Sequence, residues 1–226
     1  MSDRVEFIVV LLGGLCLSMV AGYVNTLMIV LGAPPVTHLT GSITRLSADI
    51  GQEQLGDAIT VAVLILSFVC GAAVAGVLVG SSNLRLGRRY GLAIIIESAL
   101  LAIAAITLPH SLRTATVFAA SAAGLQNAMA SSYRSLIIRT THLTGVLTDI
   151  GFSLGRVISG KQRPGWSLLL LSSIVIAFVI GGVLGAIVGV RSGGEGLWFA
   201  SAALALLGGG YFILRRVAHL GFVRNH

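Results

Sequence analysis

One pentapeptide, Thr-His-Leu-Thr-Gly, occurs twice in the chain, at residues 37–41 and 141–145. Threonine hydroxyls and imidazole rings donate and accept hydrogen bonds, so two such segments brought together could bind a small polar or anionic solute. Asn25 precedes the first copy, Gln126 and Asn127 precede the second, and all three lie in apolar stretches. These segments supply the predicted substrate-binding residues: Asn25, Thr37, His38, Thr40, Gly41, Gln126, Asn127, Thr141, His142, Thr144 and Gly145.

A purely structural role is the alternative for each of these residues. Threonines in helices can donate to their own backbone, and glycines allow helices to pack closely. Amide side chains within apolar helices commonly form hydrogen bonds to a neighbouring helix. Both interpretations stay open at the level of the sequence.

Three charged residues stand out because charge is scarce in this chain. Arg45 and Asp149 occupy equivalent places in the two copies, at an offset of 104. They would form an ion pair across a two-fold axis, unless each is solvated at its own membrane surface. Glu97 lies inside an apolar run, where a carboxyl group is a candidate for coupling to protons. The alternative for Glu97 is a hydrogen bond or salt bridge to a neighbouring helix.

The repeat extends beyond the pentapeptide in both directions. Gly-Tyr-Val-Asn at 22–25 resembles Gly-Leu-Gln-Asn at 124–127, and Phe-Val-Cys-Gly at 68–71 resembles Phe-Val-Ile-Gly at 178–181. The features follow in the same order in each half, at similar offsets. This correspondence indicates an internal duplication.

The amino-acid composition indicates whether these segments lie in water or in a lipid bilayer. Hydrophobic residues make up 55% of the chain and charged residues 10%, whereas soluble domains carry about 25% charged residues. This excludes an ordinary cytosolic enzyme, a disordered tail and a nucleic-acid-binding domain, and it indicates an all-α integral membrane protein. A bilayer is crossed by about 20 apolar residues. Six stretches are long enough: residues 7–31, 57–80, 90–108, 114–133, 167–190 and 197–214.

These stretches predict a single membrane domain over residues 1–226, with a first three-helix repeat at 7–108 and a second at 114–214. An odd number of spans in each half forces the second repeat to enter the membrane inverted, as in many secondary transporters. Each repeat carries an additional short helix that begins at the pentapeptide, with Thr37 as the candidate N-cap of the first. This short helix is either a half-helix buried inside the protein or an interfacial helix.

The basic residues predict the orientation of these spans. Of the 15 Lys and Arg residues, 12 fall on the side that holds both termini. The other side holds Arg45, Arg113 and Arg191. Because positive charge accumulates on the cytoplasmic side, both termini are expected in the cytoplasm.

A family resemblance rests on short motifs in both halves. They are Gly-Tyr-Val-Asn at 22–25, Thr-Gly at 40–41, Gly-Leu-Gln-Asn at 124–127 and Leu-Thr-Gly-Val-Leu-Thr-Asp at 143–149. Together they resemble the YoaK-type family of bacterial multi-pass membrane proteins, which is grouped under a domain of unknown function. The resemblance runs from about residue 8 to 214 and implies a bacterial plasma (inner) membrane protein with about six spans and no established substrate. The family's first motif usually has Asp and later Thr-Gly-Asn, where this chain has Asn25 and Ser42.

These features predict a secondary transporter or facilitator of a small polar or anionic solute, with a central site at the repeat interface. The alternative is a structural or partner-binding membrane protein without transport. An intramembrane enzyme is less well supported, because no H-E-x-x-H motif occurs, and no catalytic residue is predicted. Nor do we expect a cofactor, a metal site or a nucleic acid partner. The expected partners are the lipid bilayer and an unidentified small solute, and a homo-oligomer stays open.

Overall fold

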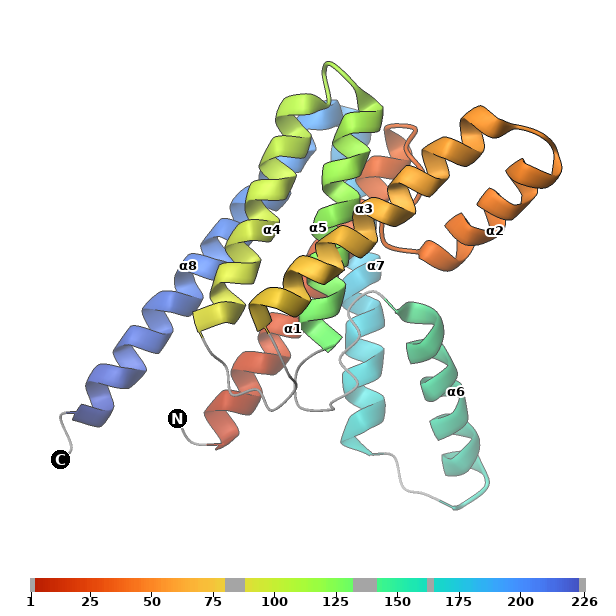
Figure 1. Ribbon diagram of the computed structural model, residues 1–226. Helices are drawn as coiled ribbons and strands as arrows, with labels where there is room; N and C mark the ends of the chain where they lie inside the picture. Colours follow the sequence, from red (N-terminus) through yellow and green to blue (C-terminus); the bar gives the residue numbers. More distant parts are fainter. Residues whose placement is uncertain (1–2, 80–87, 132–141, 162–164, 224–226) are drawn as a thin grey trace.

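The computed structural model describes residues 3–79, 88–131, 142–161 and 165–223, and every regular element in these ranges is helical (Figure 1). Helices satisfy their own backbone hydrogen bonds, which is what an apolar surrounding demands. The elements are α1 (Asp3–Val30), α2 (Leu39–Gly51), α3 (Leu55–Val79), α4 (Arg88–Thr107), α5 (Leu112–Ser131), α6 (Leu143–Ile158), α7 (Trp166–Ser192), the 3-10 turn η1 (Gly193–Glu195) and α8 (Gly196–Val223).

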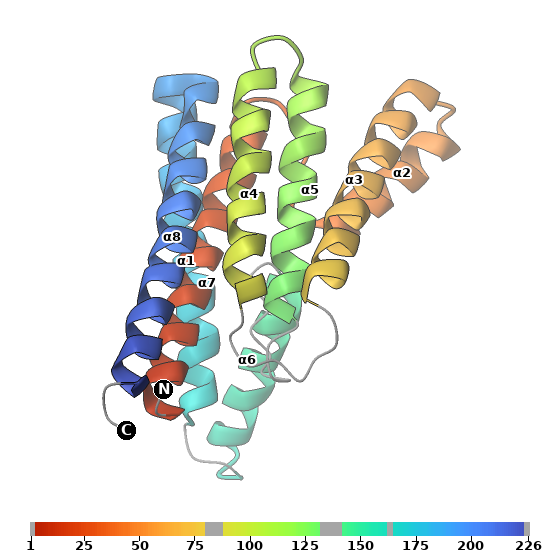
Figure 2. The same ribbon diagram turned by 60° about the vertical axis from the view of Figure 1, so that its left-hand side comes forward.

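The long helices pair across the two halves of the chain. The most extensive contacts join α1 to α7, α3 to α5, and α4 to both α8 and α5. In Figure 2, α4 and α5 stand side by side at the centre, with α3 on one side and α1, α7 and α8 on the other. One apolar core runs through the bundle, and its fully buried members include Leu27, Leu64, Leu101, Leu125 and Leu204. The halves are therefore interleaved rather than packed as separate units.

Glycines bring α1 and α7 into backbone contact. A Cβ atom on Gly22 of α1 would strike the carbonyl oxygen of Phe178 on α7. In the same way, a Cβ atom on Gly181 of α7 would strike the carbonyl oxygen of Met19 on α1. Any larger residue at either glycine would push the two helices apart. Small residues at crossings are characteristic of helix packing in membranes.

Glycines also bring the backbones of α3 and α5 into contact. A Cβ atom on Gly71 of α3 would strike the backbone of Ser121, and one on Gly124 of α5 would strike the backbone of Phe68. The Gly-rich motifs that repeat in the sequence are therefore the crossing points of two helix pairs.

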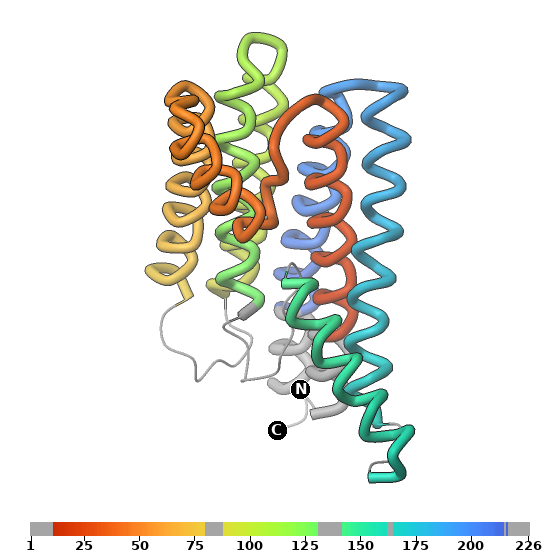
Figure 3. The backbone as a smooth tube through the Cα atoms, turned by 90° about the vertical axis from the view of Figure 1, so that its right-hand side faces the viewer, coloured from red at the N-terminus to blue at the C-terminus, as the bar shows by residue number. Residues whose placement is uncertain are grey.

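Two short helices stand apart from this bundle. α2 has 13 residues and packs on α3, while α6 has 16 residues and packs on α7. At 1.5 Å per residue they are roughly 20 Å and 24 Å long, too short to cross the ~30 Å hydrocarbon core of a bilayer. Both begin near the middle of the bundle and run toward opposite ends (Figure 1 and Figure 3). The short helix predicted to begin at each pentapeptide is present in both halves.

The prediction of an all-α, multi-pass membrane protein is confirmed, but the count of six spans is not. Within the described ranges, four helical segments have the length and hydropathy to cross a membrane: Leu11–Val30, Leu55–Val79, Arg88–Thr107 and Trp166–Leu214. There are two reasons for the difference. The alanine- and serine-rich α5, which carries Arg113, Gln126 and Asn127, is not among the four. The 49-residue stretch Trp166–Leu214 includes both α7 and most of α8, which are separated only by η1 and count as one of the four.

The glycine crossings predict a contrast between two sites in α3. Replacing Gly71 by Ala should lower the free energy of unfolding by about 1–3 kcal/mol, because the new methyl group must displace the backbone of α5. Gly76 lies in the same helix with no atom within 4 Å of the position of a Cβ. Gly76→Ala should therefore leave stability unchanged or raise it, by up to about 1 kcal/mol. Thermal unfolding of the purified variants in detergent measures both, and equal losses would contradict the proposed crossing.

Candidate functional site

The first pentapeptide lies where the chain leaves α1 and returns into the bundle. The connection turns at Gly32, whose φ is +89°, and ends at Thr37, just before α2. The backbone N–H of Thr37 donates to Oδ1 of Asn25 on α1, at 3.1 Å. Both residues are only 6% exposed, so the amide side chain satisfies a buried backbone group that no helix can satisfy. Asn25 thus holds the start of α2 in place.

His38 links this start to the other half of the chain. Its Nδ1 lies 2.7 Å from Oγ1 of Thr37, and its ring meets the ring of Phe178 on α7 edge-on, with the centroids 5.7 Å apart. His38 is itself the N-cap residue of α2, without a side-chain capping bond. The prediction of Thr37 as N-cap was therefore wrong by one residue, because the Thr37 hydroxyl is engaged by the imidazole. We call Asn25, Thr37, His38 and Phe178 the Asn25 cluster.

Phe178 was not among the predicted site residues. The signal for it was present, because Phe178 belongs to the repeated Phe-Val-x-Gly motif. The glycine of that motif is the residue from which helix packing was predicted. The ring of Phe178 forms the apolar side of the Asn25 cluster.

The second pentapeptide opens α6. His142 is the N-cap residue of α6 and is exposed. A Cβ atom on Gly145 would lie 2.7 Å from Nδ1 of His142, so this glycine makes room for the imidazole. Thr141 lies outside the described residues. An exposed imidazole beside a helix N-terminus can offer a hydrogen bond to a solute, and the dipole of the helix favours a negative group there.

The remaining pentapeptide residues are on the surface of their helices. Thr40, Gly41 and Thr144 are exposed. One turn further on, the Thr44 hydroxyl donates to the carbonyl of Thr40 at 3.0 Å, and that of Thr148 to the carbonyl of Thr144 at 2.9 Å. Thr44 and Thr148, which were not among the predicted site residues, thus bond to their own helices.

The amides of α5 are divided between two environments. Gln126 is 2% exposed and donates from Nε2 to the carbonyl of Leu17 on α1, at 2.8 Å. This is a hydrogen bond between helices, the structural alternative. Asn127, the counterpart of Asn25 in the repeat, is partly buried at the next position.

The charged residues do not pair as the sequence suggested. The Nε atom of Arg45 lies 3.7 Å from Oδ2 of Asp49, one turn further along α2. Residues four apart on a helix face one another, which makes Asp49 the nearer partner. Asp149 lies on α6 and forms no ion pair with Arg45. The predicted pair across an axis is therefore replaced by a pair within one helix.

Glu97 is deeply buried in α4. Its side chain is 2% exposed, and its Oε2 atom has no hydrogen-bond partner in the described part of the chain. Nor does Glu97 form an ion pair within those ranges, so the salt bridge considered as an alternative is not formed there. An unpaired buried carboxylate is costly in an apolar interior. The carboxyl group is therefore best accommodated in its neutral, protonated form.

Beside Glu97, a pair of serines links α4 to α8. The adjacent residue, Ser98, donates from Oγ to the carbonyl of Ser201 on α8 at 2.7 Å, and Ser201 donates to the carbonyl of Ser98 at 2.9 Å. The two serines are 103 positions apart, which is close to the offset of the repeat.

No group of three His, Cys, Asp or Glu side chains that could hold a metal occurs among the described residues.

Comparison with known proteins assigns the family. A family model described as a protein of unknown function, DUF1275, matches residues 13–209. The chain belongs to the DUF1275 family. No curated protein matches the chain, and no solved structure does. The expectation of a family of unknown function is thereby confirmed. The DUF1275 match includes both pentapeptides, the Asn25 cluster and the serine pair of α4 and α8.

The Asn25 cluster predicts a specific cost of losing one amide. In Asn25→Ala, the backbone N–H of Thr37 stays buried without an acceptor, which should lower the free energy of unfolding by about 1–3 kcal/mol. Thr44→Ala, which removes only an exposed bond within α2, should change it by less than about 0.5 kcal/mol. Unfolding of both variants in detergent tests this. If Asn25→Ala is no less stable than Thr44→Ala, the amide does not hold the start of α2.

Proposed function

We propose that this DUF1275 protein is a secondary transporter or facilitator of a small polar or anionic solute, built from six membrane-spanning helices in two inverted repeats. The observation that carries the proposal is the pair of short helices α2 and α6. Both open with the same pentapeptide, begin near the middle of the bundle and run to opposite ends (Figure 3). Broken helices that meet at mid-depth form the solute site in many transporters with inverted repeats.

The helix crossings support the inverted repeat. The repeat matches Gly22 to Gly124 and Phe68 to Phe178. Gly22 contacts Phe178, and Gly124 contacts Phe68, so each glycine meets the phenylalanine of the opposite half. A two-fold axis that exchanges the halves turns one of these contacts into the other.

The serine pair supports the position of that axis. Equivalent residues contact one another reciprocally only on or near a two-fold axis. Ser98 and Ser201 each donate to the carbonyl of the other, and their Oγ atoms are 3.2 Å apart. We infer that the axis passes between α4 and α8, beside Glu97.

The lengths of the helices support six spans. At 1.5 Å per residue, the 27 residues of α7 and the 28 of α8 are each roughly 40 Å long, enough to cross a bilayer separately. The chain reverses between them at η1 (Figure 3). α5 packs against α3 and α4, and its Gln126 is buried within the protein, so a lower hydropathy suffices.

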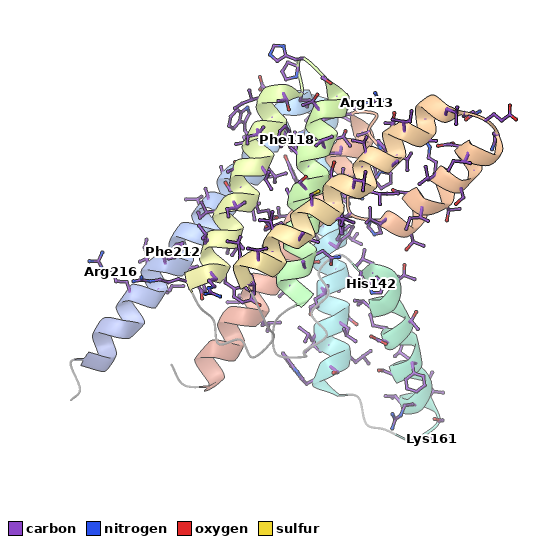
Figure 4. The ribbon with its side chains drawn as sticks, viewed as in Figure 1. Arg113, Phe118, His142, Lys161, Phe212 and Arg216 are labelled. Carbon is purple, nitrogen blue, oxygen red and sulfur yellow. The ribbon has the colours of Figure 1, made fainter. Side chains whose placement is uncertain are left out.

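The charges at the two ends support the orientation. Arg113 lies at the end toward which α2 runs, and Lys161 lies at the opposite end, where α6 finishes (Figure 4). The start of α1 and the end of α8 lie toward the end with Lys161 (Figure 1). Because most basic residues of the sequence belong to that side, we propose that it faces the cytoplasm of a bacterial cell.

The solute site follows from these elements. The N-termini of α2 and α6 carry partial positive charge and free N–H groups, which favour an anion or a hydrogen-bond acceptor. His38 and His142 stand at those termini. We propose that the solute binds between them, with Thr40, Thr144 and the main chain at Gly41 and Gly145 in reach.

The proposed site predicts that transport depends on both histidines. The full chain is reconstituted in liposomes and tested with a panel of small carboxylates, inorganic anions and amino acids. His38→Ala and His142→Ala should each lower the uptake of a transported solute by about tenfold or more, because each removes a hydrogen bond to the solute. His110→Ala, at an exposed histidine between α4 and α5, is the matched control. Uptake no faster than in protein-free liposomes for every solute would favour a structural protein instead.

Glu97 predicts how uptake is driven. In the wild type, an imposed proton gradient should accelerate uptake. In Glu97→Gln, which keeps the shape but cannot release a proton, that acceleration should be lost, while exchange of labelled for unlabelled solute continues. Uptake measured with and without the gradient separates the two. Acceleration that persists in Glu97→Gln would eliminate the coupling role.

A further inference from the structure

A cavity lies away from the pentapeptide segments. Its volume is about 150 Å³, and it is lined by the connection at Gly32, Ala33 and Pro34 together with residues of α3 and α5. It lies near the end of the bundle that carries Arg113 (Figure 4). No residue of the Asn25 cluster lines it.

Arg113 supplies the only charge in the lining of this cavity. The guanidinium donates through Nη2 to the hydroxyl of Thr60 on α3, and it forms no ion pair within the ranges that the structure describes. The Thr60 hydroxyl in turn donates to the carbonyl of Gly56 at 3.0 Å, which fixes it as an acceptor for the arginine. A guanidinium has five N–H donors, and this contact occupies one of its nitrogens.

The rest of the lining offers apolar surface and no competing donor. Val63 and Leu64 of α3 and Val117 of α5 face the cavity. The one further hydroxyl in the lining, that of Thr116, donates to the carbonyl of Leu112 at 2.8 Å. The lining therefore combines one cation, the exposed Arg113, with aliphatic side chains of α3 and α5. The absence of any carboxylate from the lining disfavours a cation.

We propose that this cavity binds a small aliphatic monocarboxylate. The carboxylate pairs with the guanidinium of Arg113, whose fork of N–H groups matches two carboxylate oxygens, and the short alkyl chain packs on Val63, Leu64 and Val117. The volume limits the ligand to a few heavy atoms, since pockets for drug-sized molecules take about 300–1,000 Å³. This site is separate from the proposed solute site at α2 and α6, and its ligand binds whether or not the protein transports it.

Propionate is the probe for this site. Its proton resonances are recorded with increasing amounts of the full chain in detergent micelles, and their broadening gives a dissociation constant. Arg113→Gln should weaken binding by about tenfold or more. Val117→Phe, which fills the cavity and keeps the arginine, should weaken it as well. Arg191→Gln removes an exposed arginine outside the lining and should leave binding unchanged, and neutral propionamide should bind at least about tenfold more weakly than propionate.

Three results would overturn the proposal. The first is broadening no greater than that in protein-free micelles. The second is equal weakening in Arg113→Gln and Arg191→Gln, which would indicate attraction to net charge alone. The third is undiminished binding in Val117→Phe, a variant that tests the cavity even if Arg113→Gln does not fold. None of these results depends on whether the liposomes take up solute, so this proposal and the proposed function fail separately.

Discussion

A backbone amide buried without a partner in apolar surroundings costs several kcal/mol, and this constraint governs the whole chain. Most of the described residues meet it by being helical. The connection from α1 to α2 cannot, because Pro34 and Pro35 interrupt it. Asn25 resolves the conflict by accepting from the N–H of Thr37. The start of α2, and with it the contact of His38 with Phe178, depends on this one amide side chain.

The pairing of the long helices follows from a second property of lipid. Apolar side chains gain little by leaving it, so helices associate through close packing and hydrogen bonds rather than through hydrophobic burial. Both are present here. Glycines bring backbones together, and hydroxyls then reach across the crossing. Ser18 of α1 donates to the carbonyl of Ile174 on α7, at 2.9 Å, and Ser121 of α5 donates to that of Ser67 on α3, at 3.1 Å.

The sequence predicted what depends on local pattern and on repetition: the helical class, the short helix after each pentapeptide and the family of unknown function. Features that depend on contacts between distant segments could not be predicted from the sequence. The partner of Arg45 was misjudged because a neighbour one turn away, Asp49, competes with any residue of the other half. Arg113 was interpreted only as a sign of orientation. Its cavity forms from three segments far apart in the chain, and no local pattern reveals such a juxtaposition.

The interleaving of the halves has a consequence for how the protein is made. During synthesis, α3 and α4 can pack against α5 as soon as α5 has been inserted. By contrast, α1 ends at Val30 and its partner α7 begins only at Trp166. Until α7 is inserted, Gly22 of α1 lacks the helix that it contacts in the bundle. In the same way, Ser98 of α4 lacks its partner Ser201 until α8 is inserted. In the order of the chain, the contacts at the middle of the bundle are therefore completed first, and α7 and α8 complete those of α1 and α4.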